Sequence, residues 1–254
     1  MTAGKNWQIK RRAALAGIAA LATSACSKIA ESPTGRSVAK ATEGWHRAAH
    51  RALANRQALV REYTKADISP DFKGNGTVRI SDESYQTSLA NGFNDWRVEV
   101  RGLVDKPMSL SMDDIRALPQ RTQITRHDCV EGWSAIGEWT GPQLSHVLDA
   151  AGVQEGANFI VFRCADTLRG GPYYESIDMV DAYHPQTIIA HRLNGAAIPQ
   201  KNGAPLRMRI ERQLGYKHPK FLTAIEAVAS FDDILGGGGG YWEDRAGYQW
   251  YAGI

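Results

Sequence analysis

The order of strand-like and helix-like segments constrains the fold of this 254-residue chain more than any other feature. Residues 96–103 alternate apolar and polar side chains, which predicts a strand, and Ser111 is a suitable N-cap for a short helix over 111–118. Further strands are predicted over 121–130, 159–164, 187–193, 206–210 and 224–231, and further helices over 43–64, 141–152 and 177–184. Because strands and helices follow no regular alternation, we predict an α+β fold with mixed sheets and short helices rather than a doubly wound sheet.

The first 26 residues are typical of an export signal. Lys10, Arg11 and Arg12 precede an apolar run over 13–22, and small residues follow up to Cys26. The adjacent arginines before a weakly hydrophobic run predict a twin-arginine signal, with an ordinary secretory signal as the alternative. The residues before Cys26 also resemble a lipoprotein cleavage site. We therefore expect a periplasmic protein, with a lipid anchor at Cys26 or with Cys26 lost together with the signal.

Composition along the rest of the chain predicts one domain behind a linker. Residues 27–42 are polar and small, which is typical of a flexible linker. A single catalytic domain is expected over 43–254, beginning with a helix and ending with a glycine run over 236–240 and an aromatic tail. Neither internal repeats nor nucleotide-phosphate fingerprints occur in the sequence.

The charge balance gives no support for nucleic-acid binding. The full chain has 30 basic and 27 acidic residues, but four of the basic residues and none of the acidic ones lie in the signal. A mature chain would thus hold 26 bases against 27 acids, whereas nucleic-acid binding usually needs a strongly basic face. We expect the partners to be a small-molecule substrate and other proteins rather than nucleic acid.

Cys129 is the residue that most directly suggests a chemistry. It follows a predicted strand within Arg126–Ser134, among a histidine, two carboxylates and a tryptophan. A thiolate at a strand end is both a nucleophile and a soft metal ligand. A disulfide with Cys164 is the ordinary expectation for an exported chain. A zinc or hydrolase site is a third reading, but it lacks a C-x-x-C spacing and an identifiable base.

Two later segments suggest a place for an anion. Gln200–Arg207 contains an Asn-Gly turn before a strand. Gly215–Lys220 places three cations, counting a protonated His218, within six residues beside a glycine and a proline. Such a loop can bind phosphate, although composition alone favours a solvated basic loop.

Taken together, these segments resemble the sulfite oxidase family. Cys129–Ser134 followed by Trp139–Gly141 is similar to its molybdenum-binding core, and Asn202–Arg207 and Gly215–Lys220 are similar to its pterin-binding segments. The resemblance extends from about Trp96 to Phe231. Each motif is weak alone, and their combination and spacing are specific.

The resemblance implies a molybdopterin-dependent oxidoreductase with a sulfite-oxidase-like fold. Its cofactors would be molybdenum and molybdopterin, and its reaction an oxygen-atom transfer, either sulfoxide reduction or a sulfite-type oxidation. Cys129 would be the catalytic residue and the molybdenum ligand. The residues implied to hold the pterin and its phosphate are Asn202, Arg207, His218, Pro219 and Lys220. Cys164 and Asn75 match further cofactor-contacting positions of the methionine-sulfoxide reductase branch.

Two departures from the family pattern shape the remaining expectations. A C-terminal immunoglobulin-like domain is not expected, because only a glycine run and a short tail follow Phe231. The haem-attachment motif C-x-x-C-H is also missing from the sequence, so electrons would pass through a separate electron-transfer protein, for which a haem protein is suited. The alternative function is an exported, non-enzymatic binding module with a Cys129–Cys164 disulfide.

Overall fold

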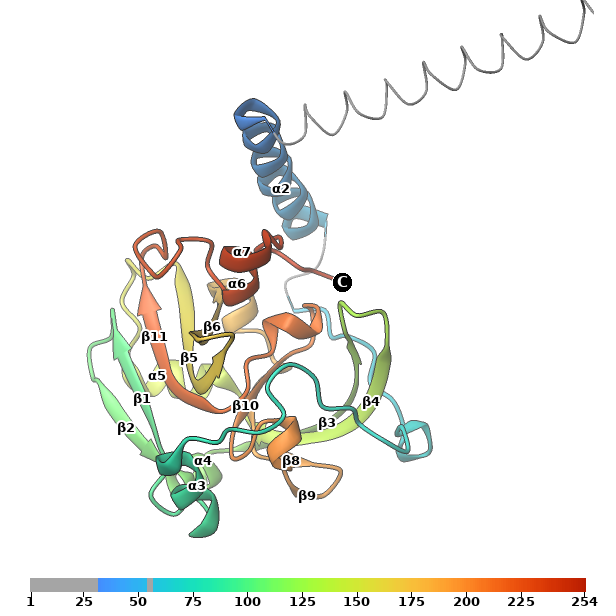
Figure 1. Ribbon diagram of the computed structural model, residues 1–254, viewed down its shortest axis with the longest axis vertical. Coiled ribbons are helices and arrows are strands. Elements are labelled where there is room, and N and C mark those ends of the chain that lie inside the picture. Colours follow the sequence, from blue (N-terminus) through green and yellow to red (C-terminus); the bar gives the residue numbers. More distant parts are fainter. Residues whose placement is uncertain (1–31, 54–56) are drawn as a thin grey trace, which may run out of the picture. The chain divides into compact units, whose positions relative to one another are not determined.

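The computed structural model describes residues 32–53 and 57–254, and it divides into two units at Leu53. Figure 1 shows the ribbon. The first unit contains helix α2, Pro33–Leu53, which begins ten residues before the predicted helix. Pro33 occupies the first helical position, where a missing N–H costs nothing, and residues 33–42, which were predicted as part of a linker, are helical in the structure. The predicted export signal and Cys26 lie outside the described residues.

Strands of the second unit, 54–254, form three sheets within the part of the chain that the structure describes. The largest sheet is mixed: β1 pairs parallel to β11, and its other pairs are antiparallel. In spatial order its strands are β2 Met108–Ser111, β1 Arg97–Gly102, β11 Leu222–Val228, β5 Phe159–Leu168 and β6 Gly171–Asp178. The second sheet holds β3 Gln120–Asp128, β4 Ser134–Pro142, β8 Arg192–Leu193 and β9 Ala196–Ala197, and β7 Thr187–Ala190 pairs with β10 Arg207–Ile210.

Short helices connect and cover these strands, so the α+β prediction is confirmed. The helical elements of this unit are η1 Lys65–Asp67, α3 Glu83–Ala90, α4 Met112–Ala117, α5 Leu144–Ala151, α6 Met179–Ala182, η2 Gln200–Asn202, η3 Gly215–Lys217 and α7 Tyr241–Ala246. Ser111 caps α4 as predicted, accepting a hydrogen bond from the backbone of Asp114. Gly152 ends α5 in the left-handed conformation. None of the described helices is long and apolar enough to cross a membrane.

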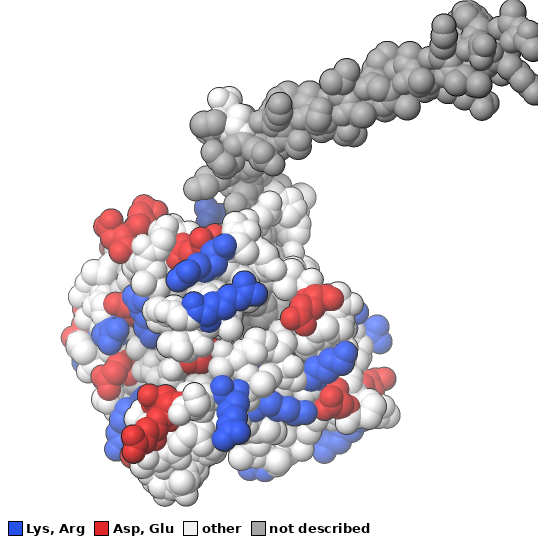
Figure 2. All heavy atoms as spheres, in the orientation of Figure 1, with Lys and Arg blue, Asp and Glu red and all other residues white. Residues whose placement is uncertain are grey.

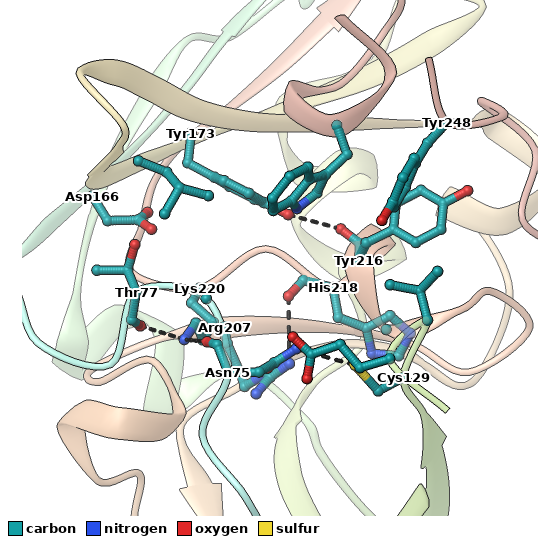
Figure 3. A pocket seen from close by; sticks show the side chains of 16 residues that line it. Asn75, Thr77, Cys129, Asp166, Tyr173, Arg207, Tyr216, His218, Lys220 and Tyr248 are labelled. Atoms are coloured by element: carbon teal, nitrogen blue, oxygen red, sulfur yellow. Dashed lines mark hydrogen bonds between the residues drawn. The ribbon is translucent and has the colours of Figure 1, made fainter. Parts of the chain in front are cut away.

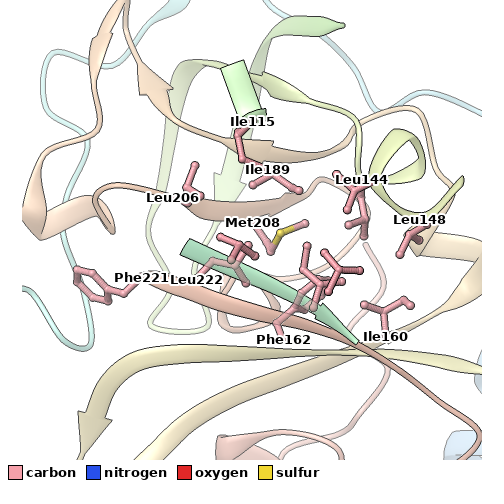
Figure 4. Close-up of a cluster of buried hydrophobic side chains, with 14 of the residues drawn as sticks. Ile115, Leu144, Leu148, Ile160, Phe162, Ile189, Leu206, Met208, Phe221 and Leu222 are labelled. Carbon is pink, nitrogen blue, oxygen red and sulfur yellow. The ribbon is translucent and has the colours of Figure 1, made fainter. Parts of the chain in front are cut away.

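The main hydrophobic core lies between the five-stranded sheet, helices α4 and α5, and the β7–β10 pair (Figure 4). Its buried side chains include Ile115, Leu144, Phe162, Met208 and Leu222. A smaller cluster around Trp139 packs beneath the β3–β4 hairpin. The two clusters fix the β10 strand and the β3–β4 hairpin relative to one another, which positions the segments that follow each of them.

Some elements were not predicted from the sequence. Strands β2, β4 and β6 and helices α3 and α7 were missed, and residues 177–184 form the end of β6 and the single turn α6 rather than one helix. The β4 strand passes so close to β7 that a Cβ at Gly141 would lie 2.0 Å from the carbonyl oxygen of Ile189. This close approach explains the glycine in the Trp139–Gly141 motif.

The surface of the second unit mixes charges of both signs. On the face drawn in Figure 2, acidic and basic side chains are interspersed rather than gathered into one continuous patch. Several of the basic side chains that matter for the site are not on the surface at all: Arg207 is 3% exposed and Lys217 is 1% exposed.

Candidate cofactor site

Cys129 lies in the tight loop of the β3–β4 hairpin. Asp128 pairs with Ser134 at the end of the ladder, and the amide of Cys129 donates to the carbonyl of Trp133 at 2.9 Å. Gly132, at a φ of 87°, closes the turn by donating to the carbonyl of Cys129. The strand end followed by a turn that the sequence predicts is therefore confirmed, and it holds the thiol in a fixed place.

The thiol faces a cavity built from segments that are far apart in the sequence (Figure 3). The cavity is open on one side, and the empty space in it, including part of the open mouth, is about 740 Å³. The lining residues are Asn75, Gly76, Thr77, Cys129, Val130, Glu131, Asp166, Leu168, Tyr173, Arg207, Gly215, Tyr216, His218, Lys220, Trp242 and Tyr248.

Two cations of this cavity, the buried Arg207 and the half-buried Lys220, lack a carboxylate partner among the described residues. Among the described residues neither Arg207 nor Lys220 forms an ion pair; Arg207 donates to the carbonyl of Asn202 at 3.0 Å and stacks over Trp139 at 5.0 Å. Burial, and after it Arg209, lowers the pKa of Arg207 to about 9. Burial, and after it Arg207, lowers the pKa of Lys220 to about 7. An anion bound in the cavity would offset this cost of uncompensated buried charge.

Lys220 also connects the two sides of the site. Its Nζ donates to the backbone carbonyl of Asn75 at 2.6 Å and to that of Thr77. Asn75 in turn donates from Nδ2 to Sγ of Cys129 at 3.3 Å. The lysine therefore fixes the loop that orients the thiol, so one basic residue affects both the charge of the cavity and the position of the sulfur.

Two buried polar atoms of residues that line the cavity, Nε of Arg207 and Nδ1 of His218, have no hydrogen-bond partner among the described residues. Because buried polar groups in native proteins are nearly always hydrogen-bonded, these atoms fit a polar ligand in the cavity. Nε2 of His218 lies 3.0 Å from the carbonyl of Gln213, so the proton resides on Nε2 and Nδ1 is left as an acceptor. Burial, followed by Arg209 and Arg207, lowers the pKa of His218 well below its usual value, which keeps the ring neutral.

The structure brings most of the predicted site residues together. Asn75, Cys129, Arg207, His218 and Lys220 line the cavity. The other three predicted residues do not line it: Asn202 accepts from Arg207 through its backbone carbonyl, Pro219 precedes Lys220, and Cys164 lies on β5 opposite Leu222 of β11.

Sequence reasoning missed much of the remaining lining. Tyr216 lies inside the Gly215–Lys220 segment, and Trp242 and Tyr248 lie in the aromatic tail. The sequence therefore contained a pattern from which these three lining residues could have been predicted. Asp166 and Tyr173 follow from the pairing of β5 with β6, which no local pattern reveals. Burial raises the pKa of Asp166 above its usual value.

The alternative readings of the cysteines are not supported by the described residues. Cys129 and Cys164 are both free, so the alternative disulfide does not form. Within the described ranges no cluster of three His, Cys, Asp or Glu side chains could hold a metal ion, which argues against a zinc site built from protein ligands alone. A metal at Cys129 would therefore need ligands from a bound cofactor.

Comparison with known proteins agrees with this geometry. Residues 85–233 match the model of the oxidoreductase molybdopterin binding domain. The protein named "Putative protein-methionine-sulfoxide reductase subunit YedZ1" of Azospira oryzae is 42% identical over 62% of this chain and 56% of its own length. The protein-methionine-sulfoxide reductase catalytic subunit MsrP of Campylobacter jejuni is 32% identical over 69% of each chain.

A solved structure, that of the sulfane dehydrogenase SoxCD from Paracoccus pantotrophus, covers 55% of this chain and 40% of its own at 22% identity and a TM-score of 0.48. The chain thus spans about half to two thirds of the length of the curated relatives it matches. Because the family model spans more than half of the sequence, the chain belongs to the molybdopterin-binding oxidoreductases of the sulfite oxidase family, whose cofactor is molybdenum held by molybdopterin.

Proposed function

We propose that this protein reduces sulfoxides to thioethers, with Cys129 as the protein ligand of molybdenum. The observation that supports the proposal most is that the Cys129 thiol faces the same cavity as the buried Arg207 and the half-buried Lys220, neither of which forms an ion pair among the described residues. The relatives whose printed names refer to protein-methionine-sulfoxide reductase favour this reaction over sulfite oxidation.

The protein residues would divide the work of holding the cofactor. Arg207 and Lys220 would bind the phosphate of molybdopterin, and Nδ1 of His218 would accept a hydrogen bond from the pterin. Sγ of Cys129, oriented by Asn75, would bind the metal. When bound, the cofactor supplies the two-electron redox chemistry and the site at which oxygen is transferred.

Reduction of a sulfoxide consumes two protons and two electrons and yields a thioether and water. Asp166 can hold one of these protons at the cavity wall, because burial raises the pKa of its carboxyl. The electrons would come from a separate electron-transfer protein, for which a haem protein is suited. The word "subunit" in the names of the relatives supports a partner of this kind.

Export to the periplasm belongs to the same proposal. It is supported by the basic residues Lys10–Arg12 ahead of an apolar run, by the paired arginines of a twin-arginine signal, and by the lipoprotein-like residues before Cys26. Fractionation of cells producing the full chain tests it, with Arg11→Lys/Arg12→Lys as the variant. Retention of this variant in the cytoplasm, while the parent reaches the periplasm, is the expected result; equal export of both contradicts a twin-arginine route.

Steady-state assays of the purified, cofactor-loaded chain test the reaction. We expect oxidation of a reduced viologen dye with methionine sulfoxide, and no such activity in Cys129→Ser. Activity with sulfite and an electron acceptor, without any activity on sulfoxides, would contradict the proposed direction and substrate.

A further inference from the structure

One wall of the cavity is aromatic, and half of it comes from the C-terminal segment. Tyr173 and Tyr216 lie on β6 and η3, whereas Trp242 and Tyr248 lie on and after α7. In Figure 3, Tyr173 and Tyr248 are on the side of the cavity opposite Cys129. A molecule approaching the thiol would therefore pass between the cofactor-holding side and these rings.

The rings form a continuous packed surface. The indole of Trp242 stacks on Tyr248 with centroids 5.6 Å apart and 21° between the planes, and Tyr248 meets Tyr216 edge-on at 5.1 Å. The hydroxyl of Tyr173 donates to the carbonyl of Tyr216 at 2.9 Å. That of Tyr216 donates to the carbonyl of Gln249 at 2.6 Å. Such mutual packing fixes the orientation of each ring.

Buried contacts hold the C-terminal segment in this position. Glu243, next to Trp242, accepts from Lys217 at 2.6 Å, and Glu175 of β6 lies 2.6 Å from the same ammonium group. Farther along, the amide of Leu214 donates to the carbonyl of Ala252 at 2.9 Å. The C-terminal segment is thus attached at two places to the loop that contributes Tyr216 and His218. The rings of Trp242 and Tyr248 are therefore held in fixed positions in the cavity wall.

The chemistry of this wall favours a neutral, partly apolar ligand. Aromatic faces bind methyl and thioether groups, and sulfur makes favourable contacts with aromatic rings. The carboxyl group of Glu131 also lines the cavity, which disfavours a small anion once the cofactor has paired with Arg207 and Lys220.

We propose that Trp242 and Tyr248 are specificity-determining residues that bind the larger organic substituent of a sulfoxide while its S–O group faces the cofactor. This inference rests on the proposed sulfoxide reduction and adds a substrate class, neutral sulfoxides with a bulky substituent. Dimethyl sulfoxide, which has only methyl groups, makes little use of the wall, whereas the neutral amide N-acetylmethioninamide sulfoxide would cover it.

The test compares these two substrates in holoenzyme carrying Trp242→Ala, Trp242→Phe or Tyr248→Ala. We expect Trp242→Ala to lower kcat/KM for N-acetylmethioninamide sulfoxide by roughly tenfold or more, chiefly through KM, and to change that for dimethyl sulfoxide by about twofold at most. Trp242→Phe keeps an aromatic face, so its kcat/KM for the larger sulfoxide should lie between those of the parent and Trp242→Ala. Trp250→Phe is the matched control, because Trp250 belongs to the same segment but does not line the cavity.

Calorimetric binding of the product N-acetylmethioninamide gives a readout independent of turnover. Its affinity should fall in Trp242→Ala and Tyr248→Ala, with molybdenum content unchanged. Equal losses for both substrates, or unchanged product affinity, would overturn this proposal while leaving sulfoxide reduction intact. A parent enzyme inactive on every sulfoxide would overturn the proposed function and this inference together. If Trp242→Ala fails to fold, Trp242→Phe and Tyr248→Ala decide by the same criteria.

Discussion

Replacing the buried Lys217 with methionine should destabilise the protein strongly, and more at pH 8 than at pH 5. The ammonium group lies 2.6 Å from carboxylate oxygens of both Glu175 and Glu243, and these side chains are 0–2% exposed. Removing one partner of a buried ion pair costs about 3–5 kcal/mol, because the remaining charge is left uncompensated. Methionine keeps most of the length of lysine, so the loss reports the charge rather than a cavity.

The pH dependence follows from proton binding by the carboxyls. Burial, and after it Glu243, already raises the pKa of Glu175 well above its usual range. A carboxyl whose pKa is raised by folding contributes stability below its unfolded pKa, and this contribution is lost as the pH rises through the folded pKa. Without the Lys217 ammonium group the pKa of Glu175 in the folded state must rise further, so more stability is lost as the pH rises. Each extra proton held by the folded state changes the unfolding free energy by about 1.4 kcal/mol per pH unit.

Urea unfolding of the full chain, followed by tryptophan fluorescence at pH 5 and pH 8, measures both effects. The matched control is Lys65→Met, because Lys65 is 83% exposed and lies 4.0 Å from Glu138, so its loss should cost about 1 kcal/mol or less. If Lys217→Met loses no more unfolding free energy than this control, or loses the same amount at both pH values, Lys217 does not compensate the buried carboxylates.

Three further predictions concern the cavity. Asp166→Asn should lower kcat about a hundredfold and remove the decline of activity as the pH rises through the raised pKa of Asp166; an unchanged pH profile of kcat would exclude proton donation by this group. Lys220→Met should reduce the pterin retained on purification about tenfold, as measured by pterin fluorescence, and full retention would contradict its role. Gly215→Ala would place a Cβ 2.4 Å from Nε2 of His127 and should cost about 1–3 kcal/mol in thermal unfolding, whereas Gly156→Ala, with open space around it, should not.

Local pattern was enough to predict the elements that deliver the site. The alternation before Cys129 and the turn after it placed the thiol at a strand end, and the turn before Arg207 placed that arginine on a strand. The resemblance to the sulfite oxidase family, and not local pattern, assigned Asn75, His218 and Lys220 to the cofactor site, and the structure places all three at the same cavity. Local pattern could place Cys129 and Arg207 because each lies next to its own structural signal.

The rest of the site depends on contacts across the chain. Asp166 and Tyr173 reach the cavity because β5 and β6 pair, and pairing partners cannot be read from either strand alone. Helix α7 is short and follows a run of glycines, so its propensity is weak, and it is held by the buried pairing of Glu243 with Lys217. Helix α2 was predicted to begin late, because small polar residues resemble a linker until Pro33 is recognised as a first helical position.

The sulfur coordination of molybdenum shows whether Cys129 is the protein ligand of the metal. X-ray absorption at the molybdenum edge should be recorded on the purified, cofactor-loaded chain and on Cys129→Ser and Cys164→Ser, whose thiols differ in that only the first lines the cavity. We predict that the parent contains molybdenum and pterin, that Cys129→Ser loses one sulfur ligand and its activity, and that Cys164→Ser keeps the full set. A parent without molybdenum, or the same sulfur coordination in Cys129→Ser as in the parent, would contradict the account.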